Sequence, residues 1–174
     1  MGGVPSGGVR LFVAIETGAP GSPAPDHLTL AFLGEVPEER GASIADALVP
    51  VAAAARPFEL TLEGVGAFPD PDRPRVVWVG ARQGRDEVER LAAATRDALG
   101  ALGFSFAREP FVAHVTLLRV RGADDRRRAR ELLEGRVAPP PARTLTVREI
   151  LVKESERTAA GVRHSTRAAL PLGT

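Results

Sequence analysis

A four-residue pattern that occurs twice constrains this chain more than any other feature. The segment HLTL at residues 27–30 returns as HVTL at residues 114–117, and the two copies hold two of the three histidines. Each copy lies in an apolar run, 27–33 or 112–120, with the length and composition of a buried strand. Because side chains alternate along a strand, the histidine and threonine of each copy share one face. The pattern predicts two strands that bury aliphatic side chains and present an imidazole beside a hydroxyl.

The elements that follow the two motifs occur in the same order. After each histidine strand the sequence indicates a helix and then two strands. This repeat predicts an α+β, bilobal fold with two antiparallel sheets and helices on their outer faces. An approximate two-fold axis then brings the motifs face to face across a central cleft. The first copy comprises segments 27–33, 37–55, 58–68 and 75–81, and the second comprises segments 114–120, 124–136, 143–153 and 162–170.

The remaining segments set the limits of these elements. A strand at 9–16 precedes the first motif, and the intervening segment 17–26 has three prolines, which is typical of a loop. Pro50 is expected to interrupt or end the first helix, because it lacks a backbone N–H. A further helix at 84–102 precedes the second motif, and Gly103 is placed to cap its end.

Composition excludes several classes of protein. The 23 basic and 22 acidic residues leave a net charge of +1, which commits the chain neither to nucleic acid nor to a membrane surface. The absence of cysteine excludes disulfides, thiolate zinc sites and a cysteine nucleophile. No apolar stretch reaches the roughly 20 residues that cross a bilayer. We expect a cytoplasmic protein with no membrane partner, a flexible leader at residues 1–8 and a single domain at residues 9–174.

Two imidazoles and two hydroxyls that meet in one cleft are suited to chemistry at phosphorus. Histidine titrates at about pH 6.5, so a neutral ring accepts a proton from water while a protonated ring supplies one to a leaving oxygen. The hydroxyls of Thr29 and Thr116 are placed to hold non-bridging phosphate oxygens. An in-line displacement needs the acid and the base on opposite sides of the phosphorus. His27 and His114 are therefore the candidate catalytic residues, with acid and base not assigned.

Simpler interpretations compete with this one. A single His-x-Thr in a strand is usually a hydrogen-bonded polar pair, although a duplicated pair is far more specific. A metal site lacks a third ligand, because no Asp or Glu shares the His-Thr face of either strand. His164 also begins a His-x-Thr, but it lies in the last strand outside the repeated motif, and we expect it to take no part in catalysis. Residues 126–128 and Arg130 form a basic cluster, which we interpret as a solvated face, with a contact to RNA backbone as the alternative.

Most of the chain from Arg10 onward carries segments typical of one family. They are RLFVAIE (10–16), HLTLAFLGEV (27–36), FPDPDRPRVVWVG (68–80), REPFVAHVTLLR (108–119) and a closing pattern of Ser155, Gly161 and Leu170-Pro171-Leu172. On these residues the chain resembles the 2H phosphoesterase superfamily, and within it the RNA 2′,3′-cyclic phosphodiesterases, also called 2′-5′ RNA ligase-like proteins. The resemblance implies metal-independent hydrolysis of RNA or nucleotide 2′,3′-cyclic phosphates to 2′-phosphomonoesters, with no cofactor.

The resemblance also implies a role for individual residues. It assigns catalysis to the two motif histidines and phosphate binding to both motif threonines and to one arginine. It further suggests that one phenylalanine of the first strand lies near the base or ribose. The set is His27 and His114 for catalysis, Thr29, Thr116 and Arg119 for phosphate, and Phe12 for substrate.

Some positions depart from the family pattern. The family's helix between the first strand and the first motif is replaced by the short segment 17–26, and Ala113 replaces a proline. His164 stands where an aromatic residue, often tyrosine, is usual. Arg119 has the wrong strand parity to share a face with His114, so its role requires a bulge, a strand end or a long reach.

These departures leave alternatives open. One is a non-catalytic module of the same fold that binds RNA ends or nucleotides. Another is an enzyme of this type that acts on a different cyclic phosphate or on a 2′-5′ linkage. The sequence does not show whether the substrate is RNA or a small cyclic nucleotide. It does not show the oligomeric state either.

Overall fold

The computed structural model describes residues 8–18 and 27–174. The expected leader therefore lies outside the described residues, except for Gly8, which starts the first strand. Most of the loop expected at 17–26 also lies outside the described residues. The described elements are β1 (Gly8–Glu16), β2 (His27–Pro37), α1 (Arg40–Ala54), β3 (Phe58–Phe68), β4 (Val76–Ala81), α2 (Arg85–Gly100), β5 (His114–Arg119), α3 (Ala123–Leu133), β6 (Arg143–Val147), β7 (Glu149–Thr158) and β8 (Gly161–Pro171).

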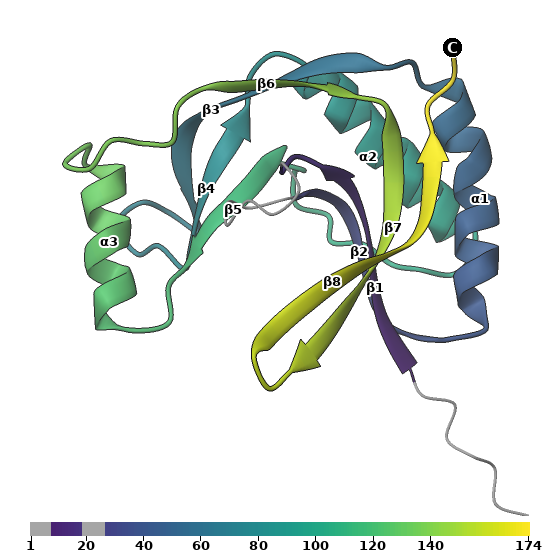
Figure 1. Ribbon diagram of the computed structural model, residues 1–174, viewed down its shortest axis with the longest axis horizontal. Coiled ribbons are helices and arrows are strands. Elements are labelled where there is room, and N and C mark those ends of the chain that lie inside the picture. Colours follow the sequence, from purple (N-terminus) through teal and green to yellow (C-terminus); the bar gives the residue numbers. More distant parts are fainter. Residues whose placement is uncertain (1–7, 19–26) are drawn as a thin grey trace, which may run out of the picture.

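The strands form two four-stranded antiparallel sheets. The first sheet has the order β2-β1-β7-β8, and the second sheet has the order β5-β4-β3-β6. Figure 1 shows the two sheets as the arms of an arch, with the second sheet and α3 on the left and the first sheet and α1 on the right. The histidine strands β2 and β5 are edge strands of different sheets, and they contact one another. This arrangement confirms the predicted bilobal α+β fold.

Helices cover the outer face of each sheet. α1 and α2 pack against each other and against β2, whereas α3 packs against β3 and β5. Leu28 and Leu30 of β2 are fully buried in the core that α1 and α2 close. His27 and Thr29 alternate with these leucines, so they lie on the inner face, which is the face turned away from the helices. No helix in the described part of the chain is long and apolar enough to cross a membrane.

The two lobes are not the two sequence repeats. β3 and β4 follow the first histidine strand but join the sheet of the second, while β7 and β8 follow the second and join the sheet of the first. The segment 143–153, predicted as one strand, is two strands, because the chain passes from the second sheet to the first at Arg148. That prediction was wrong because apolar alternation records burial and does not show which sheet a strand joins.

The predicted end of the first helix was also wrong, since α1 continues through Pro50 to Ala54. Proline removes one backbone hydrogen bond, but Pro50 is exposed and Ala52 beyond it is buried. Tertiary packing of the apolar face therefore outweighs the lost bond. Gly103, in contrast, closes α2 as expected. Its φ is +89°, and the N–H of Phe104 bonds back to the carbonyl of Leu99.

Candidate active site

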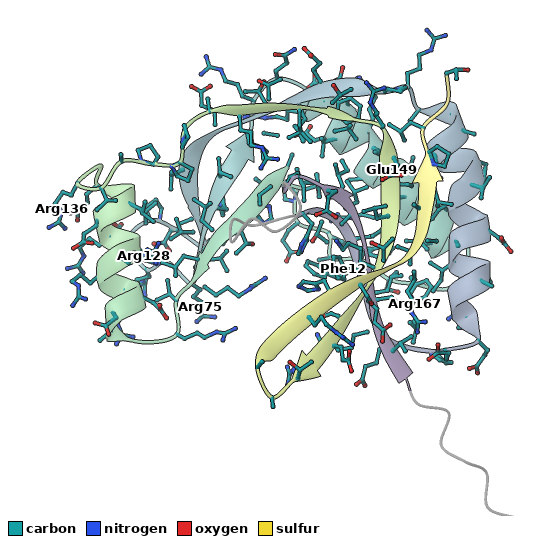
Figure 2. All side chains as sticks on the ribbon, in the orientation of Figure 1. Phe12, Arg75, Arg128, Arg136, Glu149 and Arg167 are labelled. Atoms are coloured by element: carbon teal, nitrogen blue, oxygen red, sulfur yellow. The ribbon has the colours of Figure 1, made fainter. Side chains whose placement is uncertain are left out.

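His27 lies in a cluster of three rings on the inner face of the first sheet. Its ring centroid is 5.0 Å from that of Phe12 on β1 and 4.9 Å from that of His164 on β8. Phe12 and His164 are 5.1 Å apart and meet edge to face. Phe12 is only 3% exposed, while His27 and Thr29 are half-buried. Figure 2 shows Phe12 on the arm that the first sheet forms. One apolar ring and one imidazole thus hold the first histidine.

His114 lies in a second cluster of three rings, which β3, β4 and β5 build. Its ring centroid is 4.9 Å from that of Phe68 and 5.9 Å from that of Trp78. Its Nδ1 lies 2.7 Å from the carbonyl oxygen of Val112. Because a carbonyl only accepts hydrogen bonds, Nδ1 carries the hydrogen, and Nε2 of the neutral ring is the acceptor. The second histidine is therefore held between apolar rings in a fixed tautomer.

The indole ring of Trp78 lies against two glycines of the same sheet. Gly66 pairs with Trp78, and a Cβ at Gly66 would lie 2.2 Å from the indole ring. A Cβ at Gly80 would lie 3.2 Å from it. Trp78 also pairs with Thr116 on β5. Since any larger residue at Gly66 would displace the indole, this glycine fixes the aromatic support of His114.

A one-residue irregularity in β5 changes which side chains reach the inner face. The register of β5 with β4 shifts at Leu117, which has no opposite residue. A shift of one residue reverses the faces beyond it, so Arg119 shares the inner face with His114 and Thr116. The sequence alone indicated the wrong parity for Arg119, and this bulge removes that obstacle.

The same irregularity occurs in the first motif. The register of β2 with β1 skips Leu30, so Phe32 lies on the inner face with His27. Phe32 occupies in the first motif the position that Arg119 occupies in the second, five residues after the histidine. Its side chain is 67% exposed, and its ring centroid is 6.2 Å from that of Phe12. Phe32 is not among the residues predicted from the sequence, although its equal spacing from the histidine was a usable signal.

Burial lowers the pKa of His114 below its ordinary value, because a surrounding of low dielectric constant disfavours the charged ring. The hydrogen bond to the carbonyl of Val112 opposes this shift. The positive charge of Arg119 adds to it. The net effect favours the neutral form of His114 at neutral pH.

The only lysine of the chain is buried on the inner face of the first sheet. Lys153 is 5% exposed and pairs with Phe12 across β7 and β1. Its Nζ donates a hydrogen bond to Oε2 of Glu16 at 2.8 Å. Glu16 in turn pairs with His27 across β1 and β2. A buried ammonium needs such a carboxylate, so this ion pair belongs to the surroundings of the first histidine alone. A lysine inside an apolar strand was the sequence signal for it.

Arg96 of α2 links the two histidine strands. Its Nε donates a hydrogen bond to the carbonyl of Leu30, the irregular residue of β2, at 3.1 Å. Its guanidinium also lies 4.9 Å from the centre of the Phe111 ring, in the segment that leads into β5. One side chain therefore connects the bulge of the first motif strand with the approach to the second.

His164, which sequence analysis set aside, contacts both His27 and Phe12. The pairing of β7 with β8 places it opposite Ser155. Its position where the family usually carries an aromatic ring was the signal for this contact. Within the described residues, no group of three or more histidine, cysteine or carboxylate side chains is placed to hold a metal ion.

Two sheets in an arch, each with a His-x-Thr on the inner face of an edge strand, define a bilobal 2H phosphoesterase fold. A family model described as the 2′-5′ RNA ligase superfamily matches residues 18–158. This chain belongs to that superfamily.

Similar proteins share one name for their activity. The RNA 2′,3′-cyclic phosphodiesterase of Aeropyrum pernix is 42% identical over 111 residues, which cover 62% of this chain and 62% of that protein. That of Methanothermobacter thermautotrophicus is 32% identical over 135 residues, which cover 78% of this chain and 72% of that protein. The crystal structure of E. coli LigT complexed with 3′-AMP matches with a TM-score of 0.73 and 26% identity, over 96% of this chain and 99% of that one. The chain thus spans less than two thirds of the A. pernix relative and nearly all of LigT.

Proposed function

We propose that this chain hydrolyses 2′,3′-cyclic phosphates, at RNA ends or in small cyclic nucleotides, to 2′-phosphomonoesters without a metal ion. The observation that carries the proposal is the contact between two edge strands that each present a half-buried histidine and threonine on an inner face. The names of the relatives, RNA 2′,3′-cyclic phosphodiesterases, support the substrate class. A cytoplasmic location is part of the same proposal.

His114 is the general base in this proposal. Its lowered pKa keeps the ring neutral, and the hydrogen bond to Val112 makes Nε2 the acceptor. Nε2 takes a proton from water as the water oxygen bonds to phosphorus, and His27 donates a proton to the 3′ oxygen as its bond to phosphorus breaks. The products are a 2′-phosphomonoester and a free 3′ hydroxyl. The two histidines have then exchanged protonation states.

The threonines and Arg119 stabilise the charge that develops on the phosphate. Thr29 and Thr116 lie two residues after the histidines on the same faces, so their hydroxyls donate to the non-bridging oxygens. Arg119 reaches the same inner face through the bulge at Leu117 and supplies a guanidinium. Fixed donors of this kind act most strongly in the transition state, where the phosphate oxygens carry the most charge.

Two phenylalanines of the first sheet have different roles near the nucleoside. Phe12 is 3% exposed and packs against His27, so it acts near the ribose by holding the imidazole ring of His27 in place. Phe32 is 67% exposed and offers a ring face on which a base stacks. Stacking tolerates any base, so this site discriminates little between base types.

Hydrolysis of 2′,3′-cyclic AMP in excess EDTA tests the proposal. We expect turnover to the 2′-phosphate at a rate that EDTA does not lower. No turnover, or turnover that EDTA abolishes and a divalent cation restores, contradicts the mechanism. Binding of a 2′-phosphate nucleotide without hydrolysis would instead indicate the non-catalytic module. Faster cleavage of a 2′-5′ linkage would indicate a different substrate for the same site.

A further inference from the structure

Four of the six residues that line a groove on the outer side of the second lobe are arginines. The whole chain carries 23 basic and 22 acidic residues, so this local excess of positive charge stands out. Figure 2 shows α3, with Arg128 and Arg136 labelled, on the outer side of the second sheet. The groove has a volume of about 390 Å³ and is lined by Arg126, Arg127, Arg130, Arg136, Glu131 and Ala123.

The lining contains one carboxylate, that of Glu131, while the carboxylates beside the groove already have partners. The carboxylate of Asp125 accepts hydrogen bonds from the backbone N–H groups of Arg121 and Gly122 at 2.8 and 3.2 Å. Asp124 pairs with Arg127 at 3.1 Å, and Glu134 pairs with Arg136.

Of the four arginines in the groove lining, two therefore add positive charge that the single lining carboxylate, Glu131, does not fully offset. In the part of the chain that the structure describes, neither Arg126 nor Arg130 forms an ion pair. These residues are four apart on α3, and like charges at that spacing destabilise a helix. An external anion would relieve this repulsion.

The groove lies along the path that leads away from His114. α3 starts at Ala123, shortly after the end of β5, and packs against β5. Arg119 ends β5 on the inner face, and Arg75 is fixed beside it, because its carbonyl accepts the N–H of Val120 at 2.9 Å. At about 3.3 Å per residue, β5 spans roughly 17 Å from His114 to its end. A single nucleotide held at His114 is too short to reach α3, whereas an RNA strand is long enough.

We propose that this groove binds the phosphate backbone of an RNA whose cyclic end lies at the two histidines. The strand leaves His114 along β5, passes Arg119 and Arg121, and places a phosphate between Arg126 and Arg130. A guanidinium group can donate two hydrogen bonds to the oxygens of one phosphate, and such a contact does not distinguish one base from another. The groove therefore selects substrates by the length of the RNA chain and not by their bases. The identity of the bound end rests on the proposed function, but the affinity of the groove for RNA does not.

The test compares substrates of two lengths in two matched double variants. Arg126→Gln with Arg130→Gln removes the two groove arginines that form no ion pair. Arg90→Gln with Arg128→Gln removes the same amount of charge from α2 and from a position of α3 outside the groove. The substrates are 2′,3′-cyclic AMP and an RNA of about twelve nucleotides with a 2′,3′-cyclic end. For the groove variant we expect KM for the RNA to rise about tenfold and its salt dependence to weaken by about 0.7 in log–log slope, since the contact with one phosphate is lost. KM for cyclic AMP and both KM values of the control variant stay within about twofold.

Each other outcome decides against a part of the proposal. Equal losses on both substrates, or an equal loss of RNA affinity in the control variant, overturn the groove. If the wild-type chain hydrolyses neither substrate, the proposed function falls, and fluorescence anisotropy with the same RNA then decides the groove alone. RNA binding that is weaker in the groove variant but not in the control variant supports the groove. If the wild-type chain binds no RNA, the groove proposal is overturned.

Discussion

The two motif histidines occupy equivalent positions in their strands but have different neighbours. His114 packs against the apolar rings of Phe68 and Trp78, whereas His27 packs against Phe12 and a second imidazole. The difference extends beyond the rings. An arginine lies five residues after His114, and an exposed phenylalanine lies five residues after His27. Two nearly identical motifs thus become chemically unequal through side chains outside them. An acid and a base need this inequality, because identical surroundings would give both histidines the same protonation state.

Removal of either histidine has the largest expected effect and tests whether the two act as a unit. We expect His27→Ala and His114→Ala each to lower kcat for 2′,3′-cyclic AMP by about a thousandfold or more, and the double variant to be little slower than either single one. Steady-state kinetics measure this, with circular dichroism to confirm folding. A double variant whose loss equals the product of the two single losses would show that the two sites work independently.

Removal of Arg119 tests whether its charge makes the surroundings of His114 different from those of His27. We expect Arg119→Gln to lower kcat/KM by about thirtyfold, because one phosphate donor is lost. Arg119 helps to lower the pKa of His114, so its loss raises that pKa. A base must be deprotonated, and activity is lost as the pH falls through its pKa, so the acidic limb of the pH profile moves to higher pH.

The matched change on the other lobe is Phe32→Leu. It replaces the residue equivalent to Arg119 without changing a charge, so it raises KM and leaves the acidic limb in place. An acidic limb that stays fixed in Arg119→Gln would contradict the assignment of His114 as the base.

Replacement of His164 by phenylalanine makes the two ring clusters alike. We expect His164→Phe to lower kcat less than tenfold, because His164 supports His27 by ring contact and transfers no proton in the proposed mechanism. Steady-state kinetics beside His27→Ala give the comparison. A loss as large as that of His27→Ala would make His164 a third acid–base group and overturn the two-histidine mechanism.

The buried ion pair of the first sheet has the smallest expected effect on activity and a measurable effect on stability. Glu16→Gln leaves the ammonium of Lys153 buried without a carboxylate, so we expect the free energy of unfolding to fall by about 2 kcal/mol. The matched control is Glu156→Gln, which breaks an exposed pair with Arg163 and should cost less than about 0.5 kcal/mol. Urea unfolding of both variants measures the difference. Equal losses would show that burial of Lys153 does not matter.

The sequence predicts well which face of a strand is buried, but it predicts poorly which strands pair and in which register. Leucines 28 and 30 are buried and His27 faces away from them, because burial leaves an alternating pattern in the strand itself. The bulges at Leu30 and Leu117 leave no such pattern, since they exist only relative to a neighbouring strand. They nevertheless decide whether the side chain five residues after each histidine lies on the same face as that histidine.

Strand pattern alone could not predict the contact of His164 with His27 for a related reason, although the family position of His164 pointed to it. It depends on the register of β8 with β7 and on the place of β7 beside β1, and both are long-range choices. The exchange of strands between the sheets is of the same kind. Local apolar periodicity indicated the segments of both sheets but could not tell which strands would pair.

The exchange of strands has a consequence for the order in which the protein forms. The second sheet comes from one continuous stretch, β3 to β6, whereas the first sheet joins Leu11 on β1 to Glu154 on β7. Closing so long a loop costs chain entropy and slows folding. As the chain leaves the ribosome, the sheet of His114 can therefore close once β6 is made, while β2, which carries His27, stays in a two-stranded pair with β1 until β7 and β8 complete its sheet. We expect a nascent chain to hold one half of its chemistry and to be inert until the last strands are made.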